Sequence, residues 1–440
     1  MKGFMIAAPS SNTGKTTITT GIIRALEKQG YFVSPYKTGP DYIDGKFLSM
    51  AAGTRAGNLD LHLQGEEGVR EALSMGKGDI AVIEGVMGYF DGSSNTWEKS
   101  SYDISKRLDI PVVLVYTPKG EMFSAVPKIK GMAEFEDSRI QGVILNKTSK
   151  RMYEMLKEAI ENHTSLSVIG HIPYDQDLEI DSESLGLLEP GRITGLEKKI
   201  ERMAELVQEN LDMEKLLSIA RDLDISRAAK LDKGDMRVAV AMDDAFSFHY
   251  KENLELLRSM ANVCFFSPVY DRALPEADLV ILGGGYPEKY KERLSENRSM
   301  ILSIREYGEG GGHILAEGGG MLYLMDTLEG VEMCGLLKGD ARMTDRLQRF
   351  GYVNISIGED CVLGKAGTEI PANEFHKSVV ENTDEPIFRI NKPLGNHSWA
   401  CGYKRKNVLG YFQHLNLAGK SSLLKGILDE VISGGGKDVY

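Results

Sequence analysis

The residues best suited to chemistry lie near the start of the chain, at positions 10–17, Ser-Ser-Asn-Thr-Gly-Lys-Thr-Thr. A short apolar run precedes them at 4–8, and apolar residues at helical spacing follow them. A strand, a tight turn and a helix that begins with Gly-Lys-Thr form a phosphate-binding loop, in which backbone N–H groups face the anion. Lys15 would reach the outer phosphates and the Thr16 hydroxyl would hold Mg²⁺. We therefore expect a nucleoside triphosphate site formed by Asn12, Thr13, Gly14, Lys15, Thr16 and Thr17.

The match to the phosphate-loop pattern G-x-x-x-x-G-K-[ST] is incomplete, because Pro9 stands in the place of the first glycine. Asn12 tolerates a left-handed backbone and can restore part of the lost conformational freedom. An ordinary helix N-terminus is the alternative interpretation. The position of Gly-Lys-Thr-Thr at a strand-to-helix turn favours the phosphate loop.

Carboxylates follow two further predicted strands. Asp41 and Asp44 lie in the loop after the strand predicted at 32–37, and Glu84 ends the apolar run at 80–83, seven residues before Asp91. Ligands of open α/β sheets collect beyond the carboxyl ends of the strands, so Glu84 would face the phosphate loop. A carboxylate there can bind Mg²⁺ directly or through water. A solvated loop carboxylate is the alternative for Glu84, Asp44 and Asp91.

The alternation of strands and helices over the first 173 residues predicts an α/β fold with a parallel, doubly wound sheet. Asn146 ends one of these strands, where its amide would either read a base edge or form a turn. We expect three parts: a nucleotide-binding domain at 1–195, a helical connector without strands at 196–235, and a second α/β domain at 236–440. In the second domain, the apolar run at 313–316 leads through Gly318 into a helical pattern, as in a sharp strand-to-helix turn.

The composition narrows the class of protein. The chain has 440 residues, of which 42% are hydrophobic and 26% charged, and its formal net charge is −12. Such an acidic chain with no basic block argues against nonspecific binding to nucleic acid or to an anionic membrane. No apolar run approaches 18 residues and no signal peptide is apparent, so we expect a cytoplasmic protein. The four cysteines form no C-x-x-C pair, which gives no support for a disulfide framework or a cysteine metal site.

Several blocks of sequence together resemble the cobyrinate a,c-diamide synthases, glutamine-dependent amide ligases that act on corrinoid or related tetrapyrrole carboxylates. The resemblance rests on Lys-Thr-Gly-Pro-Asp-Tyr-Ile-Asp at 37–44, on 58–60, on 84–92 and on 142–146 in the first half. It continues with Gly-Gly-Gly-Tyr-Pro-Glu at 283–288, with 341–344 and with Glu-Phe-His at 374–376. The methanogen enzymes that amidate nickel sirohydrochlorin are similar as well. The resemblance implies a first domain like dethiobiotin synthetase and a second like class I glutamine amidotransferases.

The family resemblance also implies a reaction. A substrate carboxylate, on a tetrapyrrole, attacks the γ-phosphate of ATP bound with Mg²⁺, and ammonia then displaces phosphate from the acyl phosphate. The residues implied in catalysis are Lys15, Asp41, Asp44, Glu84 and Asp91, with Asp44 and Asp91 at the carboxylate substrate. The implied metal ligands are Thr16, Asp41 and Glu84. The resemblance adds Lys37 and Asn146 to the nucleotide-binding residues, with Asn146 near adenine, and it suggests a homodimer.

One position departs from the family. Its glutaminase turn reads Ala-Glu-Cys-Gly-Gly, whereas positions 316–320 read Ala-Glu-Gly-Gly-Gly, so Gly318 stands where the nucleophile is expected. Glycine is comfortable in a strained turn, so the backbone should keep its shape. His414 matches the family's general base but has no thiol to activate, and the Gly284 and Gly319 amides would form an idle oxyanion hole.

The expected consequence is the loss of glutaminase activity. Loss of a nucleophile costs on the order of a millionfold in turnover, which leaves roughly 10⁻⁵ per second of a typical 10 per second. We therefore expect ammonia, either free or from an ammonia-supplying protein, as the nitrogen source. Two alternatives stay open: the same ATP-dependent activation with a different acid or amine, and a nucleotide-binding pseudoenzyme or partner subunit. Retention of the complete carboxylate and lysine set favours a ligase.

Overall fold

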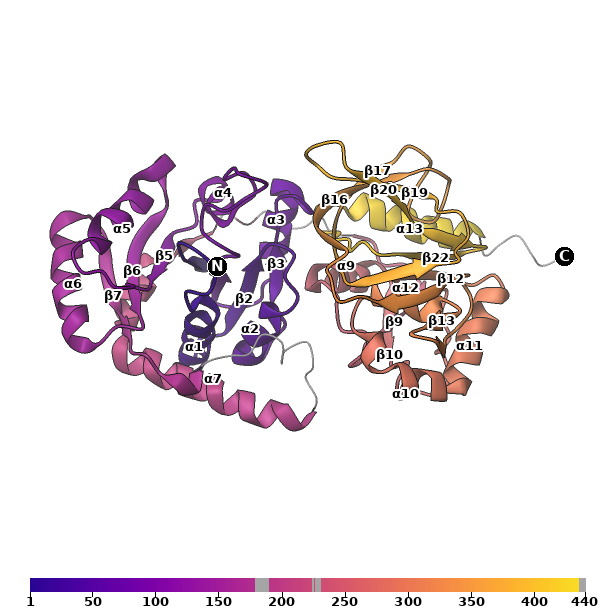
Figure 1. Cartoon of the computed structure of the whole chain (residues 1–440), viewed down its shortest axis with the longest axis horizontal. Helices are drawn as coiled ribbons and strands as arrows, with labels where there is room; N and C mark the ends of the chain where they lie inside the picture. The colour runs from indigo at the N-terminus through magenta and orange to yellow at the C-terminus, as the bar shows by residue number, and fades with distance from the viewer. Residues whose placement is uncertain (179–189, 224, 226–230, 435–440) are drawn as a thin grey trace. The chain divides into compact units, whose positions relative to one another are not determined.

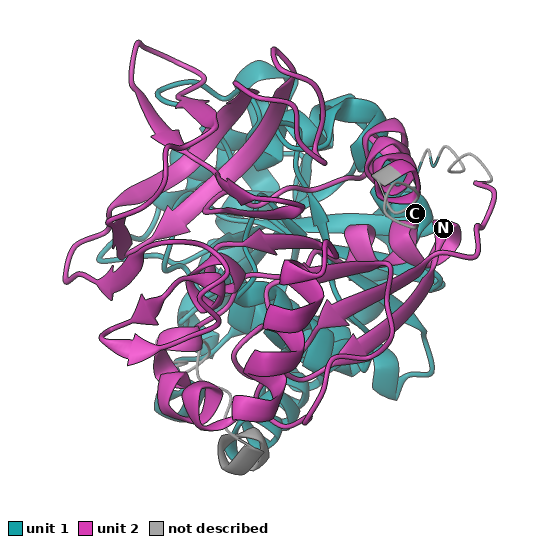
Figure 2. Ribbon diagram, turned by 90° about the vertical axis from the view of Figure 1, so that its right-hand side faces the viewer, with its two compact units in different colours: residues 1–228 teal, residues 229–440 magenta. Residues whose placement is uncertain are grey.

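The computed structural model describes residues 1–178, 190–223, 225 and 231–434, and the chain forms two compact units, 1–228 and 229–440 (Figure 2). Unit 1 contains a sheet whose strands follow the order β3-β2-β4-β1-β5-β6-β7, and all of these pairings are parallel. The short strand β8 pairs antiparallel with β1. The strands are β1 (Lys2–Ala7), β2 (Val33–Thr38), β3 (Gly57–Leu59), β4 (Ile80–Glu84), β5 (Val112–Tyr116), β6 (Ile140–Asn146), β7 (Ser167–Ile172) and β8 (Arg221–Asp222).

Helices connect the parallel strands of unit 1 (Figure 1). They are α1 (Lys15–Lys28), α2 (Asp44–Ala52), α3 (Gly65–Ser74), α4 (Ser101–Arg107), α5 (Ala125–Glu134), α6 (Lys150–His163), α7 (Pro190–Asn210) and α8 (Met213–Ile219). The central strands β1, β2, β4 and β5 are buried along almost their whole length, which explains their continuous apolar runs. The predicted parallel, doubly wound α/β sheet is confirmed.

The segment predicted as a helical connector, 196–235, contains much of α7 and all of α8. The helix α7 packs along α1, and Arg24 of α1 forms ion pairs with Glu197 and Glu201 (Figure 1). At the crossing, a Cβ on Gly21 would lie 2.8 Å from the Met203 carbonyl oxygen. The expectation that this segment has no strand is wrong, because β8 adds to the sheet of unit 1. The domain boundaries at 195 and 235 stay predictions.

Unit 2 is built on a six-stranded sheet of order β10-β9-β11-β12-β22-β21, parallel except for β21. Its strands are β9 (Arg237–Ala241), β10 (Asn262–Phe266), β11 (Leu279–Leu282), β12 (His313–Glu317), β21 (Tyr403–Arg405) and β22 (Val408–Tyr411). Its helices are α9 (Lys251–Met260), α10 (Lys291–Glu296), α11 (Arg298–Glu309), α12 (Gly319–Leu324) and α13 (Ser421–Gly434). This parallel arrangement agrees with a second α/β domain.

Two four-stranded sheets complete the described part of unit 2. One contains β13 (Thr327–Leu328), β14 (Val331–Glu332), β15 (Asp340–Met343) and β18 (Ser378–Glu381). The other follows the order β17-β16-β19-β20 and is antiparallel throughout, with β16 (Arg349–Ile357), β17 (Glu369–His376), β19 (Phe388–Asn391) and β20 (Ser398–Cys401). In the part of the chain that the structure describes, no helix is long and apolar enough to span a bilayer.

Two helical glycines allow a matched test of how α7 packs. Gly21→Ala brings a methyl group against the Met203 backbone, which cannot swing away, so we expect the free energy of unfolding of unit 1 to fall by about 1–3 kcal/mol. Gly131→Ala on α5 meets no atom within 4 Å and should raise it by about 0.5–1 kcal/mol. Urea unfolding of both variants measures the difference. Equal stabilities would contradict the close packing of α1 against α7.

Candidate nucleotide and ligase site

The predicted phosphate loop joins β1 to α1. Gly14 precedes the first residue of α1 with φ +86°, a left-handed backbone that favours glycine, and Asn12 is also left-handed at φ +60°. A Cβ at Gly14 would lie 2.4 Å from the Asn146 amide nitrogen, so the loop also needs glycine for space. Thr17 lies in the first turn of α1. The strand, turn and helix therefore stand as the sequence pattern predicts.

Asn146 supports this loop from the end of β6. Its Nδ2 donates a hydrogen bond to the Thr13 carbonyl at 2.7 Å, and the Thr117 hydroxyl donates to the same oxygen at 3.2 Å. Asn146 is buried. The predicted position of its amide near adenine stays a prediction, since the amide nitrogen here holds the loop.

Lys15 is folded back over the loop. Its Nζ donates to the Ser10 carbonyl at 3.0 Å and to the Met87 carbonyl at 2.6 Å. Burial and the neighbouring Lys37 ammonium lower the pKa of Lys15 to about 8. Asp91, by contrast, is exposed and accepts a hydrogen bond from the Gly88 N–H at 2.9 Å, but its charge still acts on Lys15. The structure therefore places a weakly basic lysine within the electrostatic range of Asp91.

A buried network of charges lies beside the loop. Lys37 and Glu84 are direct partners in the register of β2 and β4, and their side chains form an ion pair at 2.9 Å. The same Glu84 oxygen accepts a hydrogen bond from the Thr16 hydroxyl at 2.6 Å, and Lys37 also pairs with Asp44 at 2.7 Å. Burial raises the pKa of Glu84, against the lowering effect of Lys37. Burial opposes the charge of Lys37, but Glu84 and Asp44 together raise its pKa.

The second carboxylate oxygen of Glu84 is a free ligand position. Glu84 is fully buried, and its Oε2 has no hydrogen-bond partner among the described residues. An orphaned, buried carboxylate oxygen next to the Thr16 hydroxyl fits a divalent cation, because Mg²⁺ takes one or two protein oxygens together with phosphate oxygens and water. No group of three or more His, Cys, Asp or Glu side chains suited to a metal occurs among the described residues. Phosphates and water would thus complete the shell.

Asp41 shapes the loop that leads into α2. Its Oδ1 accepts hydrogen bonds from the backbone N–H groups of Ile43 and Asp44 at 2.8 and 3.1 Å. Burial, followed by the nearby charge of Asp44, raises the pKa of Asp41. The Asn58 amide donates to the carbonyls of Gly39 and Asp41 at 2.9 and 3.0 Å. The structure therefore places Asp41 beside Asp44, which is itself an ion-pair partner of Lys37.

Sequence reasoning missed several supporting residues. It did not predict the ion pair of Lys37 with Glu84, the hydrogen bond from the Asn58 amide to the Gly39 carbonyl, or the contact of Lys15 with the Met87 carbonyl. The partial signal for the ion pair is that Lys37 and Glu84 both stand at the ends of predicted strands, but only the structure shows that β2 and β4 are neighbours in this register. The Met87 contact has no signal, because it depends on the path of a loop.

In unit 2, the strand-to-helix turn occurs at Gly318, between β12 and α12. Its backbone has φ +49° and ψ −112°, a conformation that favours glycine. A Cβ at this position would lie 2.9 Å from Cε1 and 3.1 Å from Nε2 of His414. The other ring nitrogen of His414 faces a carboxylate oxygen of Glu317 at 3.3 Å. Position 318 thus faces a histidine oriented by a carboxylate, and sequence reasoning had not assigned Glu317 this role.

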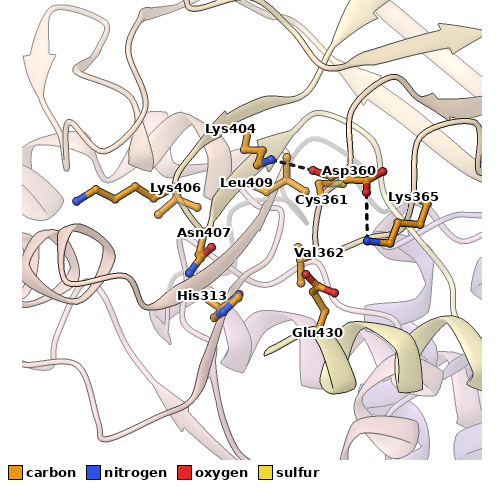
Figure 3. A pocket seen from close by; sticks show the side chains of 11 residues that line it. His313, Asp360, Cys361, Val362, Lys365, Lys404, Lys406, Asn407, Leu409 and Glu430 are labelled. Atoms are coloured by element: carbon orange, nitrogen blue, oxygen red, sulfur yellow. Dashed lines mark hydrogen bonds and ion pairs between the residues drawn. The ribbon is translucent and has the colours of Figure 1, made fainter. Parts of the chain in front are cut away.

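A pocket in unit 2 lies at the end of β12 opposite to Gly318. His313, the first residue of that strand, lines it together with Cys361 and Glu430, and Asp360 lies between the ammonium groups of Lys404 and Lys365 (Figure 3). Burial lowers the pKa of His313. The length of β12 separates this pocket from Gly318, so it is not the predicted glutaminase site.

Each of the two units matches a known protein family. Residues 4–188 match the CobQ/CobB/MinD/ParA nucleotide binding domain, and residues 237–422 match the CobB/CobQ-like glutamine amidotransferase domain. A cobyrinate a,c-diamide synthase of Clostridium tetani is 40% identical over 98% of this chain and 100% of the relative. That of Clostridium acetobutylicum is 41% identical over 97% of this chain and 100% of the relative. That of Listeria monocytogenes is 39% identical over 94% of this chain and 96% of the relative.

The chain belongs to the cobyrinate a,c-diamide synthase family. It is accordingly an ATP-dependent carbon–nitrogen ligase with a nucleotide-binding domain and a glutamine amidotransferase-like domain. The phosphate loop of unit 1 falls inside the first matched region, and the turn at Gly318 falls inside the second.

The lowered pKa of Lys15 makes nucleotide binding depend on pH. Phosphates favour the charged lysine, so its pKa rises on binding, and between about pH 8 and the raised value a proton is taken up with the nucleotide. The affinity for ATP should therefore fall above pH 8, by at most about tenfold per pH unit. Calorimetry at pH 8.5 in buffers of different ionisation enthalpy measures the proton. Lys15→Met should abolish its uptake, and wild-type binding without uptake would refute this assignment.

Proposed function

We propose that this protein amidates the a and c side-chain carboxylates of a cobyrinate or sirohydrochlorin-type tetrapyrrole, with ATP and with ammonia rather than glutamine. The observation that carries the proposal is a contrast between the two units. In unit 1, Thr16, Lys37 and Glu84 form a connected site beside Lys15. In unit 2, position 318 faces His414 but offers no sulfur. The names of the relatives support the substrate class.

In the proposed reaction, ATP with Mg²⁺ supplies the γ-phosphoryl group that activates the carboxylate. The loop N–H groups and Lys15 bind the phosphates, and Lys15 must exchange the carbonyls of Ser10 and Met87 for them. Thr16 and Glu84 would hold the metal, with Asp41 as a further ligand. Asp44 and Asp91 would position the carboxylate substrate. Such a transfer requires alignment and charge neutralisation more than covalent chemistry.

The nitrogen source follows from the chemistry of position 318. Glutamine hydrolysis by this class of domain needs a nucleophile at the turn, and a general base without it leaves a negligible rate. The two buried cysteines do not replace it: burial raises the pKa of Cys334 to about 12 and of Cys401 to about 11, so both stay protonated. We infer that free ammonia, or ammonia from another protein, displaces phosphate from the acyl phosphate.

The proposal extends to the assembly and the location of the protein. A homodimer is proposed from the family resemblance, and a cytoplasmic location from the sequence composition. A ligase for a different acid or amine, or a pseudoenzyme subunit, would share the nucleotide site but not the turnover of the tetrapyrrole.

An amidation assay tests the nitrogen source. Each exchange of OH for NH₂ lowers the mass by about 1 Da. Purified protein with ATP, Mg²⁺ and cobyrinic acid should therefore yield monoamide and diamide products about 1 and about 2 Da lighter than the acid when ammonium is supplied, and no product above background with glutamine alone. Mass spectrometry of the macrocycle reads both arms. Lys15→Met, which removes the ammonium proposed to bind the phosphates and leaves the buried Lys37–Glu84 pair in place, serves as the inactive control. Amidation at comparable rates with glutamine would overturn the ammonia proposal.

Restoring a thiol tests unit 2. In Gly318→Cys, the new side chain would point toward the His414 ring. We expect this variant to release glutamate from glutamine at least about 10³-fold faster than Gly318→Ala. The alanine variant imposes the same backbone strain without sulfur, so it is the matched control. A coupled glutamate dehydrogenase assay measures the release. Absence of activity in a folded Gly318→Cys variant would mean that unit 2 has lost more than its nucleophile.

A further inference from the structure

Lys15 lies close to several carboxylates of unit 1, yet its ammonium forms no ion pair with any described acidic residue. Burial and then the Lys37 charge lower its pKa, and the charges that act against them are those of Glu84, Asp44 and Asp91. Its two hydrogen bonds go to neutral acceptors, the backbone carbonyls of Ser10 at 3.0 Å and Met87 at 2.6 Å. A carboxylate is the stronger acceptor for an ammonium. The two carbonyls must therefore be held firmly where they lie.

The Met87 carbonyl belongs to the turn at 85–88 that follows β4. Met87 has φ +49°, a left-handed conformation that is unfavourable for a methionine. Its side chain is exposed, so side-chain packing does not explain this conformation. The Gly85 N–H donates to the Ile6 carbonyl at 2.8 Å and ties the start of the turn to β1. The contacts that fix the turn between this point and Met87 are those of the intervening residue.

Two buried hydroxyls hold that residue, Val86. Its N–H donates to Thr38 Oγ1 at 2.8 Å and to Ser101 Oγ at 3.1 Å, and the two hydroxyl oxygens lie 3.0 Å apart. The Ser101 hydroxyl also donates to the Val86 carbonyl at 3.4 Å. Thr38 ends β2, Ser101 begins α4, and both are fully buried. We call Thr38 and Ser101 the hydroxyl pair. It fixes both backbone polar groups of the residue before Met87.

The arrangement matters because a charged acceptor is available to Lys15. The Oε2 atom of Glu84 is buried and has no hydrogen-bond partner among the described residues. An ion pair between Lys15 and this oxygen would occupy the position that fits Mg²⁺. ATP would then have to break a buried ion pair before the lysine reached its phosphates. A lysine held by neutral carbonyls exchanges them for phosphate at a lower cost.

We propose that the hydroxyl pair positions the Met87 carbonyl so that it holds Lys15 in a releasable contact and keeps the free oxygen of Glu84 open for the metal. This inference rests on the proposed roles of Lys15 and Glu84 toward ATP and Mg²⁺. Thr38 and Ser101 act through the turn, so they are positioning residues and not catalytic ones. A role in stability alone is the alternative, and it predicts no change in how the metal assists nucleotide binding.

Calorimetric titration with ATP, once with Mg²⁺ and once with EDTA, tests this inference without turnover. The ratio of the two dissociation constants measures how far the metal assists binding. Thr38→Val removes one hydroxyl and keeps the shape of the side chain. We expect it to raise the Kd for ATP with Mg²⁺ by about tenfold or more and to move the ratio toward unity. Ser101→Ala should act in the same direction but less, because its bond to the Val86 N–H is longer.

Two further variants control for folding and for the loss of a buried hydroxyl. Thr38→Ser keeps the hydroxyl and should restore the ratio of the wild type. Thr20→Val is the matched control, because Thr20 is also fully buried but its hydroxyl has no partner among the described residues. It should leave both dissociation constants unchanged. An unchanged number of ATP sites per chain in each titration shows that the variant is folded.

The outcomes separate this inference from the proposed function. A ratio equal to that of the wild type in folded Thr38→Val would overturn the inference, and amidation with ammonium by the wild type would still support the function. A lost ratio in Thr38→Val together with a wild type that amidates no acid would refute the function and retain the positioning role. Equal ATP affinity of the wild type with Mg²⁺ and with EDTA would overturn the inference and the metal role of Glu84 together.

Discussion

The buried ion pair between Lys37 and Glu84 is the interaction on which the candidate active site depends. It joins neighbouring strands at the end of the sheet where the phosphate loop lies, and the Thr16 hydroxyl connects it to the first turn of α1. Burying two charges is costly, and only their mutual attraction and further hydrogen bonds offset that cost. Removing one partner would leave a bare charge in the core, typically at a cost of about 3–5 kcal/mol. The Lys37–Glu84 contact therefore contributes both to the stability of unit 1 and to the candidate active site.

The same contact explains why the site suits a cation and a polyphosphate. One carboxylate oxygen of Glu84 is used by Lys37 and Thr16, and the other is buried without a partner among the described residues. Lys15 is held by two carbonyls and is depressed in pKa by burial and by Lys37. Anionic phosphates would supply what both groups lack: a partner for the lysine and oxygens that complete a metal shell.

Unit 2 has the backbone conformation of a strand-to-helix nucleophile turn at Gly318 but no nucleophilic side chain there. The backbone at Gly318 adopts a conformation that few other residues tolerate, and the His414 ring lies where a side chain at 318 would point. Glu317 still faces the opposite nitrogen of that ring. The electrostatic arrangement for activating a nucleophile thus persists without one, and the proposed use of ammonia follows from this single position.

Local patterns predicted much of unit 1. The apolar run, the turn with Gly14 and the helix that starts at Lys15 follow from residue types over 15 positions, and Glu84 was placed correctly because it ends a buried run. Contacts between distant segments were not predictable. The bond from Asn146 to Thr13 and the pairing of Phe350 with Phe375 depend on strand register, which no short window of sequence contains. The strand β8 has only two residues and no periodicity to detect.

The central claim is that unit 1 activates a carboxylate by phosphorylation. Oxygen-18 in the carboxylates of cobyrinic acid tests it most directly, with unlabelled ATP, Mg²⁺ and ammonium. The account predicts that one labelled oxygen appears in inorganic phosphate for each amide formed, because the carboxylate oxygen leaves with the phosphoryl group. Amide formation or ATP hydrolysis that leaves the phosphate unlabelled would contradict it.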